Sequence, residues 1–220
     1  MLEDDALEDA ENLADPDILA AESVGVSFRN LPVYCGVVMR PRFREDKATQ
    51  AAAVLLRERG GKMNYMKLLE LLYLADREAL VRWGRPITYD AYVSMRNGPV
   101  LSRTYEMISE GVPPDRASLW RDCISQPADY SVSLIAECPT DQLSTAEEDL
   151  LAEVYREYGH LNRWQLVDVC HTLPEWTDPG DSAIPIDYET ILRAGGKSEA
   201  EAAEIVRELE AVAVADILFR

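Results

Sequence analysis

Histidine and cysteine are the side chains best suited to catalysis, and this chain has few of them. Its two histidines are His160 and His171, and His171 directly follows Cys170. Adjacent side chains on a helix diverge by about 100°, so this cysteine and histidine are poorly placed to act as nucleophile and base. A hydrolase or transferase using His171 would need a nucleophile from elsewhere in the chain. The alternatives are packing for His171 and hydrogen bonding to helix-terminal carbonyls for His160.

Motifs that bind nucleotides, phosphate or zinc are missing. The sequence has no GxGxxG, Walker, GxSxG or HExxH pattern, and the pairs Gly60-Gly61 and Gly195-Gly196 lack the Lys-Ser/Thr of a phosphate loop. The acidic run at 147–149 falls in the first turn of an expected helix, where the helix dipole favours carboxylates. We therefore expect no metal, no other cofactor and no enzymatic activity.

The cysteines and the N-terminus favour a cytoplasmic protein. Cysteines at positions 35, 123, 138 and 170 show no CxxC spacing, which is typical of reduced thiols. The opening MLEDDALEDAE lacks the positive start and apolar centre of a secretory signal. No apolar run approaches the roughly 20 residues that cross a bilayer, so no membrane association is expected.

The net charge of −18 argues against a general binder of nucleic acid, because cationic side chains supply most of that affinity. The charge is also unevenly distributed. Residues 1–28 hold nine acids and no base, residues 29–121 carry a net +6, and residues 122–220 carry a net −15. Neutralisation between these segments is one explanation, and an anion site in the basic middle is the other.

One basic cluster, RPRFR, places Arg40, Arg42 and Arg44 around Phe43. Together with the further bases up to residue 62, it could meet an acidic surface, including the protein's own acidic tail. A DNA-binding autoregulator acting through segment 40–62 is an alternative function. Against it, a DNA-reading helix is expected to bring more polar base-reading side chains.

Hydrophobic periodicity and capping signals predict most of the secondary structure. The pattern from Tyr65 to Trp83 repeats at i, i+3 and i+4 and stops at Gly84. Helices are expected at 47–59 with Asp46 as cap, 65–83, 100–109, from the capping box Ser144–Glu147 to 158, from Asn162 to 171, and from the box Ser198–Glu201 almost to the C-terminus. Strands are expected at 33–39, 91–96, 119–125 and 130–137.

The last two of these strands are expected to form a hairpin, and Asn97-Gly98-Pro99 a turn that starts the helix at 100–109. The stretch 173–185 has no clear pattern. The resulting fold class is α+β, predominantly α-helical, with about six helices and one small antiparallel sheet or hairpin.

Two stretches carry a family resemblance. The first, MKLLELLYLADREALVRWGRPITYDAYVSMRNGPVLSRTYE, resembles the Panacea domain of SocA-like and phage-associated, GepA-like antitoxins, with a KLLxLLYxAD helix, a YGRPIT-like loop and a YVxxxxGPV strand and turn. The second, EYGHLNRWQLVDVCHTLPEW, resembles the same family's later signature. The resemblance spans roughly residues 45–180.

The resemblance implies a non-enzymatic antitoxin of a type II system, whose partner is a cognate protein toxin. Some SocA-like members also act as adaptors that deliver the toxin to a protease such as ClpXP. The residues that match the family motifs, and that have structural or toxin-contact roles by resemblance, are Leu68, Leu72, Tyr73, Asp76, Arg85, Pro86, Tyr92, Gly98, Pro99, Val100, Tyr105, Gly159, Leu166, His171 and Trp176.

Three segments are expected. Residues 1–28 form an acidic N-terminal extension, residues 29–185 the Panacea-like domain, and residues 186–220 a C-terminal helical segment packed on that domain or extending from it. The two ends have no counterpart in the family pattern. Because a shared scaffold that meets many toxins must vary somewhere exposed, we expect partner specificity in these ends.

Overall fold

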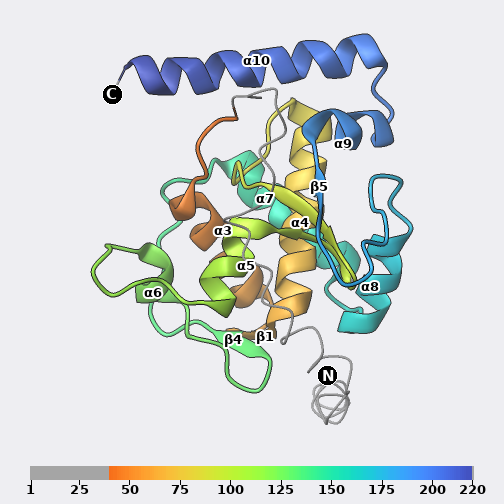
Figure 1. The fold of residues 1–220 in the computed structure, drawn as a ribbon. Helices are drawn as coiled ribbons and strands as arrows, with labels where there is room; N and C mark the ends of the chain where they lie inside the picture. The colour runs from red at the N-terminus through yellow and green to blue at the C-terminus, as the bar shows by residue number, and fades with distance from the viewer. Residues whose placement is uncertain (1–39, 220) are drawn as a thin grey trace.

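The computed structural model describes residues 40–219, and Figure 1 shows their arrangement. The strand expected at 33–39 lies outside the described residues. The helices are α3 (Glu45–Glu58), α4 (Tyr65–Trp83), α5 (Ser102–Ser109), α6 (Leu119–Cys123), α7 (Thr145–Tyr158), α8 (Arg163–His171), α9 (Tyr188–Ala194) and α10 (Glu199–Leu218). The strands are β1 (Lys62–Asn64), β2 (Tyr92–Met95), β3 (Gly98–Leu101), β4 (Ser131–Ser133) and β5 (Ile184–Ile186).

The fold is α+β with helices predominating, which confirms the predicted class. Within residues 40–219 there are eight helices, where about six were expected, and two antiparallel sheets instead of one. One sheet pairs β1 with β4, and the other has the strand order β3-β2-β5. None of the helices in this part of the chain has the length and apolar character needed to cross a membrane.

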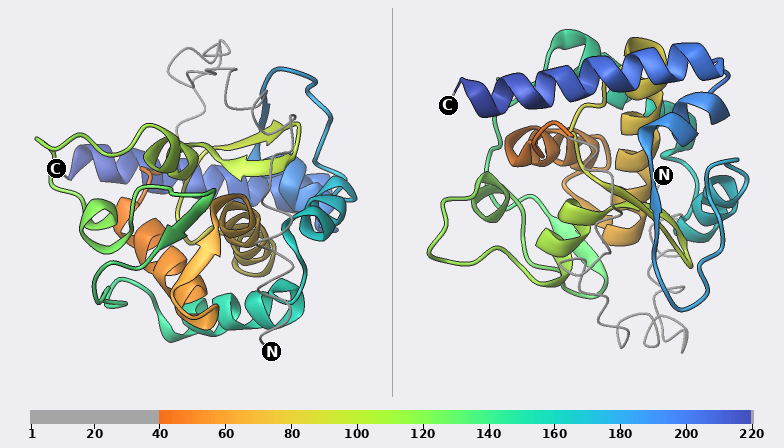
Figure 2. Two further views of the ribbon diagram at one scale, coloured as in Figure 1. Left: turned by 90° about the horizontal axis from the view of Figure 1, so that it is seen from below. Right: turned by 45° about the horizontal axis from the view of Figure 1, so that its top comes forward.

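Helix α4 is the centre of the molecule and was predicted with its correct ends. It begins where the Asn64 side chain accepts hydrogen bonds from the backbone N–H groups of Met66 and Lys67. It ends at Gly84, whose left-handed φ of 70° suits glycine. Helices α3, α7, α8 and α9 and strand β3 all contact α4 (Figures 1 and 2). Its N-terminal half is therefore buried on nearly every side.

The hairpin of β2 and β3 lies against α4. Its register pairs Tyr92 with Leu101 at one end and Met95 with Gly98 at the other. The expectation that Pro99 starts a helix is wrong, because Pro99 belongs to β3 and α5 begins only at residue 102. Residues 98–101 pair with β2, so the chain stays extended after the turn and the helix starts only at residue 102. Gly98 still serves the turn, since its φ of 124° is rarely open to other residues.

The hairpin expected from 119–125 and 130–137 is also wrong in its main part. The first segment is mostly α6, which Ser118 caps with its side chain. The second contains β4, whose strand partner is β1. Contact with the first segment is limited to a few backbone hydrogen bonds, such as that from Ser125 N–H to the carbonyl oxygen of Ser133 at 2.8 Å. One isolated bridge joins Ile124 to Leu134, so the two segments do run side by side. The strand that pairs with β4 is distant in the sequence, and the alternation of polar and apolar residues does not indicate which strand that is.

Capping signals located the later helices well. Both predicted capping boxes form, Ser144 with Glu147 at α7 and Ser198 with Glu201 at α10. Asn162 caps α8 as expected and makes a further box with the third residue of the helix. Reciprocal hydrogen bonds within four residues are local, so the sequence alone reveals them.

Two local details differ from expectation. Helix α3 begins at Glu45, one residue before the predicted cap Asp46, whose side chain lies in the first turn instead. The stretch 173–185 leads into β5, and α9 follows it without having been predicted. Asp187 caps α9, but seven residues are too few to display a helical period.

Helix α10 crosses one end of the molecule (Figure 1) and contacts α9. Ala202, Leu209 and Ala213 are its buried side chains, whereas Leu218 and Phe219 at its end are 72% and 89% exposed. The segment boundaries at residues 28 and 185 stay predictions.

Candidate functional site

Asp76, a motif residue in the fourth turn of α4, holds the RPIT loop at residues 85–88 against the helix. Its carboxylate accepts hydrogen bonds from the backbone N–H groups of Ile87 (2.8 Å) and Thr88 (3.0 Å), from the Thr88 hydroxyl, and from the Tyr92 hydroxyl (3.0 Å). Burial raises the pKa of Asp76 to about 6, although these four donors pull it down. Every polar group of this buried cluster is satisfied, so its role is to fix the backbone.

Asp90 does the same for the start of α5. Its carboxylate accepts hydrogen bonds from the N–H groups of Ala91 (2.7 Å), Arg103 (2.9 Å) and Thr104 (2.9 Å), and from the Thr104 hydroxyl (2.8 Å). Burial raises the pKa of Asp90 to about 7, again against its donors. The carboxylate supplies acceptors for N–H groups that have no partner at a helix start.

Glu175 ties the second family signature to α4. It accepts hydrogen bonds from the Tyr73 hydroxyl (3.0 Å) and from the guanidinium of Arg77 (2.5 Å for Nε). The Glu175 side chain is completely buried, and that of Arg77 is 15% exposed. Burial, followed by the Glu175 charge, raises the pKa of Tyr73 well above its usual value. This network joins segments about a hundred residues apart.

His171 and Trp176 hold the tip of the β2–β3 hairpin. Their rings stack at 3.9 Å between centroids with planes 20° apart. His171 Nε2 lies 3.1 Å from the carbonyl oxygen of Arg96, and Trp176 Nε1 donates to the carbonyl oxygen of Met95 at 3.0 Å. These contacts support the packing interpretation of the histidine, because its ring and one nitrogen already have structural partners.

Cys170, the residue before this histidine, is poorly suited to act as a nucleophile. Its side chain is completely buried, and burial raises the pKa of its thiol well above the usual value. Within the described residues, Cys123, Cys138 and Cys170 are all free and buried.

Most of the other motif residues belong to the core or its turns. Leu68, Leu72, Tyr92, Val100 and Leu166 are buried hydrophobic residues. Arg85 is exposed and Pro86 buried at the start of the RPIT loop. Gly159 follows α7, where an added methyl would collide with the backbone of Tyr155. Tyr105 differs from these, because it is half-buried and lines a pocket.

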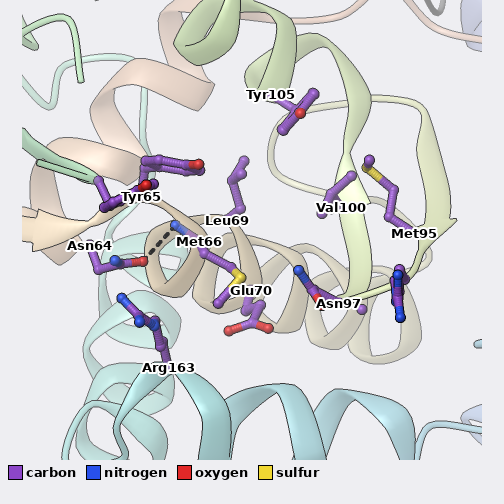
Figure 3. Close-up of a pocket in the computed structure, with 13 residues that line it drawn as sticks. Asn64, Tyr65, Met66, Leu69, Glu70, Met95, Asn97, Val100, Tyr105 and Arg163 are labelled. Atoms are coloured by element: carbon purple, nitrogen blue, oxygen red, sulfur yellow. Dashed lines mark hydrogen bonds between the residues drawn. The ribbon is translucent and has the colours of Figure 1, made fainter. Parts of the chain in front are cut away.

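This pocket, called here the Glu70 pocket, has a cavity volume of about 90 Å³. The first turns of α4, the tip of the β2–β3 hairpin, Tyr105, Tyr130 and Arg163 line it (Figure 3). Four residues of its wall are Met66, Leu69, Met95 and Val100. The structure therefore gathers parts of both family signatures around one cavity.

Glu70 is the polar group that sets this pocket apart. Its side chain is 1% exposed, and neither carboxylate oxygen has a hydrogen-bond partner in the part of the chain that the structure describes. Burial raises the pKa of Glu70 well above the usual value, while the charge of Lys67 lowers it. A buried carboxylate without a partner is costly and rare in native proteins.

The basic segment 40–62 contacts the protein's own acids. Arg44 pairs with Asp46 at 2.7 Å, and Lys47 pairs with Glu147 at 2.7 Å. These pairs support the view that the basic middle of the chain is neutralised internally, at least in part.

Comparison with protein families gives a match to the antitoxin SocA-like Panacea domain over residues 68–177. That range holds the second family signature, all but the first two residues of the first signature, the three buried networks and most of the Glu70 pocket. The chain belongs to this family. Membership supports an antitoxin role and a protein partner such as a toxin, and favours a function other than catalysis. Neither the curated proteins nor the solved structures give a match.

Sequence reasoning found Asp76 but missed Asp90, Glu175 and Glu70. Asp90 acts on residues 13 and 14 positions further along the chain, and Glu175 on residues 98 and 102 positions back. No spacing rule links such partners. The one available signal for Glu70 was a charge within a run of leucines, in a helix expected to be buried.

Proposed function

We propose that this Panacea-domain protein is the antitoxin of a type II system and neutralises a cognate protein toxin by direct binding. The observation that carries the proposal is that the family-signature residues and the residues beside them hold the fold together. Asp76, Glu175, His171 and Trp176 all make hydrogen bonds that hold the scaffold together. A rigid scaffold of this kind suits a binding function.

The net charge of the chain also supports this proposal. The chain carries −18, and its first 28 residues hold nine acids and no base. A charge of this sign suits a basic toxin, because electrostatic matching speeds association and discriminates against wrong partners. Affinity itself would come from a few buried anchors.

The test begins with the product of the neighbouring reading frame. That product should be toxic when produced alone and tolerated when this protein is co-produced, and the two purified proteins should form a complex. Deleting residues 1–22 should slow association at low salt and flatten its salt dependence. Unchanged association kinetics would remove the acidic tail from the account.

Delivery of the toxin to a protease is the second mechanism that the family resemblance suggests. Measuring neutralisation in a host that lacks ClpXP distinguishes delivery to the protease from occlusion by binding alone. Full neutralisation there supports occlusion by binding alone, and its loss supports delivery. Both mechanisms place the protein in the cytoplasm, where the free cysteines would stay reduced.

A further inference from the structure

The Glu70 pocket contains a group that the fold itself does not use. Glu70 lies on α4 six residues before Asp76 and is equally buried, yet its two oxygens accept no hydrogen bond from any described residue. An isolated buried carboxylate is unfavourable unless a partner compensates it. Here the carboxylate lines an open cavity, so the compensating group can come from another molecule.

The walls of the pocket define what that group can be attached to. Met66 and Leu69 from α4 and Val100 from β3 supply apolar side chains to the lining of the pocket (Figure 3). The rings of Tyr65 and Tyr130 lie 6.5 Å apart at the same pocket. Aliphatic stems pack on such walls, and cations are attracted to the faces of aromatic rings.

Lys67 donates no hydrogen bond to the Glu70 carboxylate. It is 1% exposed and its charge lowers the pKa of Glu70, but no hydrogen bond between described residues reaches the carboxylate. Arg163 also lines the pocket, and its guanidinium carbon lies 5.0 Å from the Trp164 ring. The carboxylate can therefore accept a further cationic donor.

We propose that the Glu70 pocket binds a basic side chain of the protein partner, an arginine or lysine whose stem packs on the apolar walls and whose cation pairs with the Glu70 carboxylate. The identity of that partner as the toxin rests on the function proposed above. Such a side chain would be one of the anchors that supply affinity, and a basic residue suits a partner of this acidic chain.

Methionine methyl groups report directly on the pocket. The full-length protein, labelled with ¹³C at its methionine methyls, is titrated with n-butylguanidinium and n-butylammonium as mimics of the two side chains. The signals of Met66 and Met95, which line the pocket, should shift and saturate, whereas that of Met107, which lies outside it, should not. Neutral n-butylurea and anionic valerate are the matched controls of similar size.

The variant Glu70→Gln keeps the shape of the side chain and removes its charge. It should weaken binding of n-butylguanidinium by about tenfold or more, because a hydrogen bond to a charged group is lost. Glu78→Gln is the control on the same helix, since Glu78 pairs with Arg82 away from the pocket, and should bind as the parent does. A second variant, Met66→Lys, places an ammonium four residues before Glu70 and should block the probe while Glu70 is intact.

Three results would overturn the proposal: no response to either cation, equal binding in Glu70→Gln, or a response to valerate instead. The last would mean that Arg163 and Arg96 make this an anion site.

In the toxin assay, Glu70→Gln should lose neutralisation together with probe binding. Loss of probe binding with full neutralisation would overturn the toxin-anchor role. Failure of the unaltered protein to bind the neighbouring gene product would count against the proposed function instead, because the probe titration does not depend on it.

Discussion

Asp76 and Glu70 are two equally buried carboxylates on the same helix with opposite surroundings. Asp76 receives four hydrogen bonds, from the loop that follows α4 and from β2. Glu70 receives none from the described residues and lines a cavity. The pKa of both is raised by burial. The difference therefore lies in their partners and not in their exposure.

This contrast separates a group that stabilises the fold from one that is available for binding. Removing the partner of a satisfied buried group leaves donors stranded, whereas removing an unsatisfied charge strands nothing. The two carboxylates should accordingly respond in opposite ways to mutation.

The largest effect should come from Asp76→Ala. The substitution leaves the N–H groups of Ile87 and Thr88 and the hydroxyl of Tyr92 without their acceptor in the core, so the free energy of unfolding should fall by about 3–5 kcal/mol. Urea unfolding followed by circular dichroism measures this. A loss under 1 kcal/mol would show that the loop does not depend on Asp76 and would break the contrast.

The pH dependence of stability should reveal the same carboxyl group. Burial raises the pKa of Asp76 to about 6 in the folded protein, whereas its unfolded-state pKa lies near 4. The stabilisation that arises from this difference is complete below about pH 4 and is lost as the pH rises through about 6. The stability advantage of the parent over Asp76→Asn should therefore shrink by up to about 3 kcal/mol between pH 4 and 7. An advantage that grows over this range would mean that the four donors outweigh burial.

A smaller effect is expected from Gly98→Ala at the hairpin turn. The φ of 124° is strained for alanine, and the new methyl would lie 3.4 Å from Cys170 Cβ and 3.6 Å from Glu70 Oε1. We expect a loss of about 1–2 kcal/mol in thermal unfolding, together with weaker binding of n-butylguanidinium. Unaltered binding of n-butylguanidinium would show that the pocket does not depend on the turn at Gly98.

The smallest effect on stability should come from Glu70→Gln. Since no described residue donates to this carboxylate, its neutralisation should change the free energy of unfolding by less than about 1 kcal/mol, and the change can be stabilising. Thermal unfolding at pH 7 measures it, with Glu78→Gln alongside. A loss as large as that of Asp76→Ala would show that Glu70 supports the fold.

Local signals predicted the parts of the fold that depend on neighbouring residues. The period of α4, its end at Gly84 and the capping boxes of α7 and α10 all act within a few residues, and all were found. A strand was correctly expected around β4, but its partner β1 was not, and helix α9 was missed, because pairing with β1 and packing against α4 are contacts between distant segments.

The residues of the candidate site also fall into those that the sequence revealed and those that required the fold. The family signatures led to Asp76, His171 and Trp176, whose types and order are visible in the sequence. Asp90 and Glu175 required the fold, since their partners lie far along the chain. Glu70 is distinguished by what it lacks, and a missing partner is visible only in three dimensions.

The titration of Glu70→Gln with n-butylguanidinium, run beside thermal unfolding of the same sample, tests the central contrast most directly. We expect an unfolding midpoint close to that of the parent and a lost response at Met95. A midpoint lowered as far as in Asp76→Ala, with the Met95 response retained, would contradict this expectation.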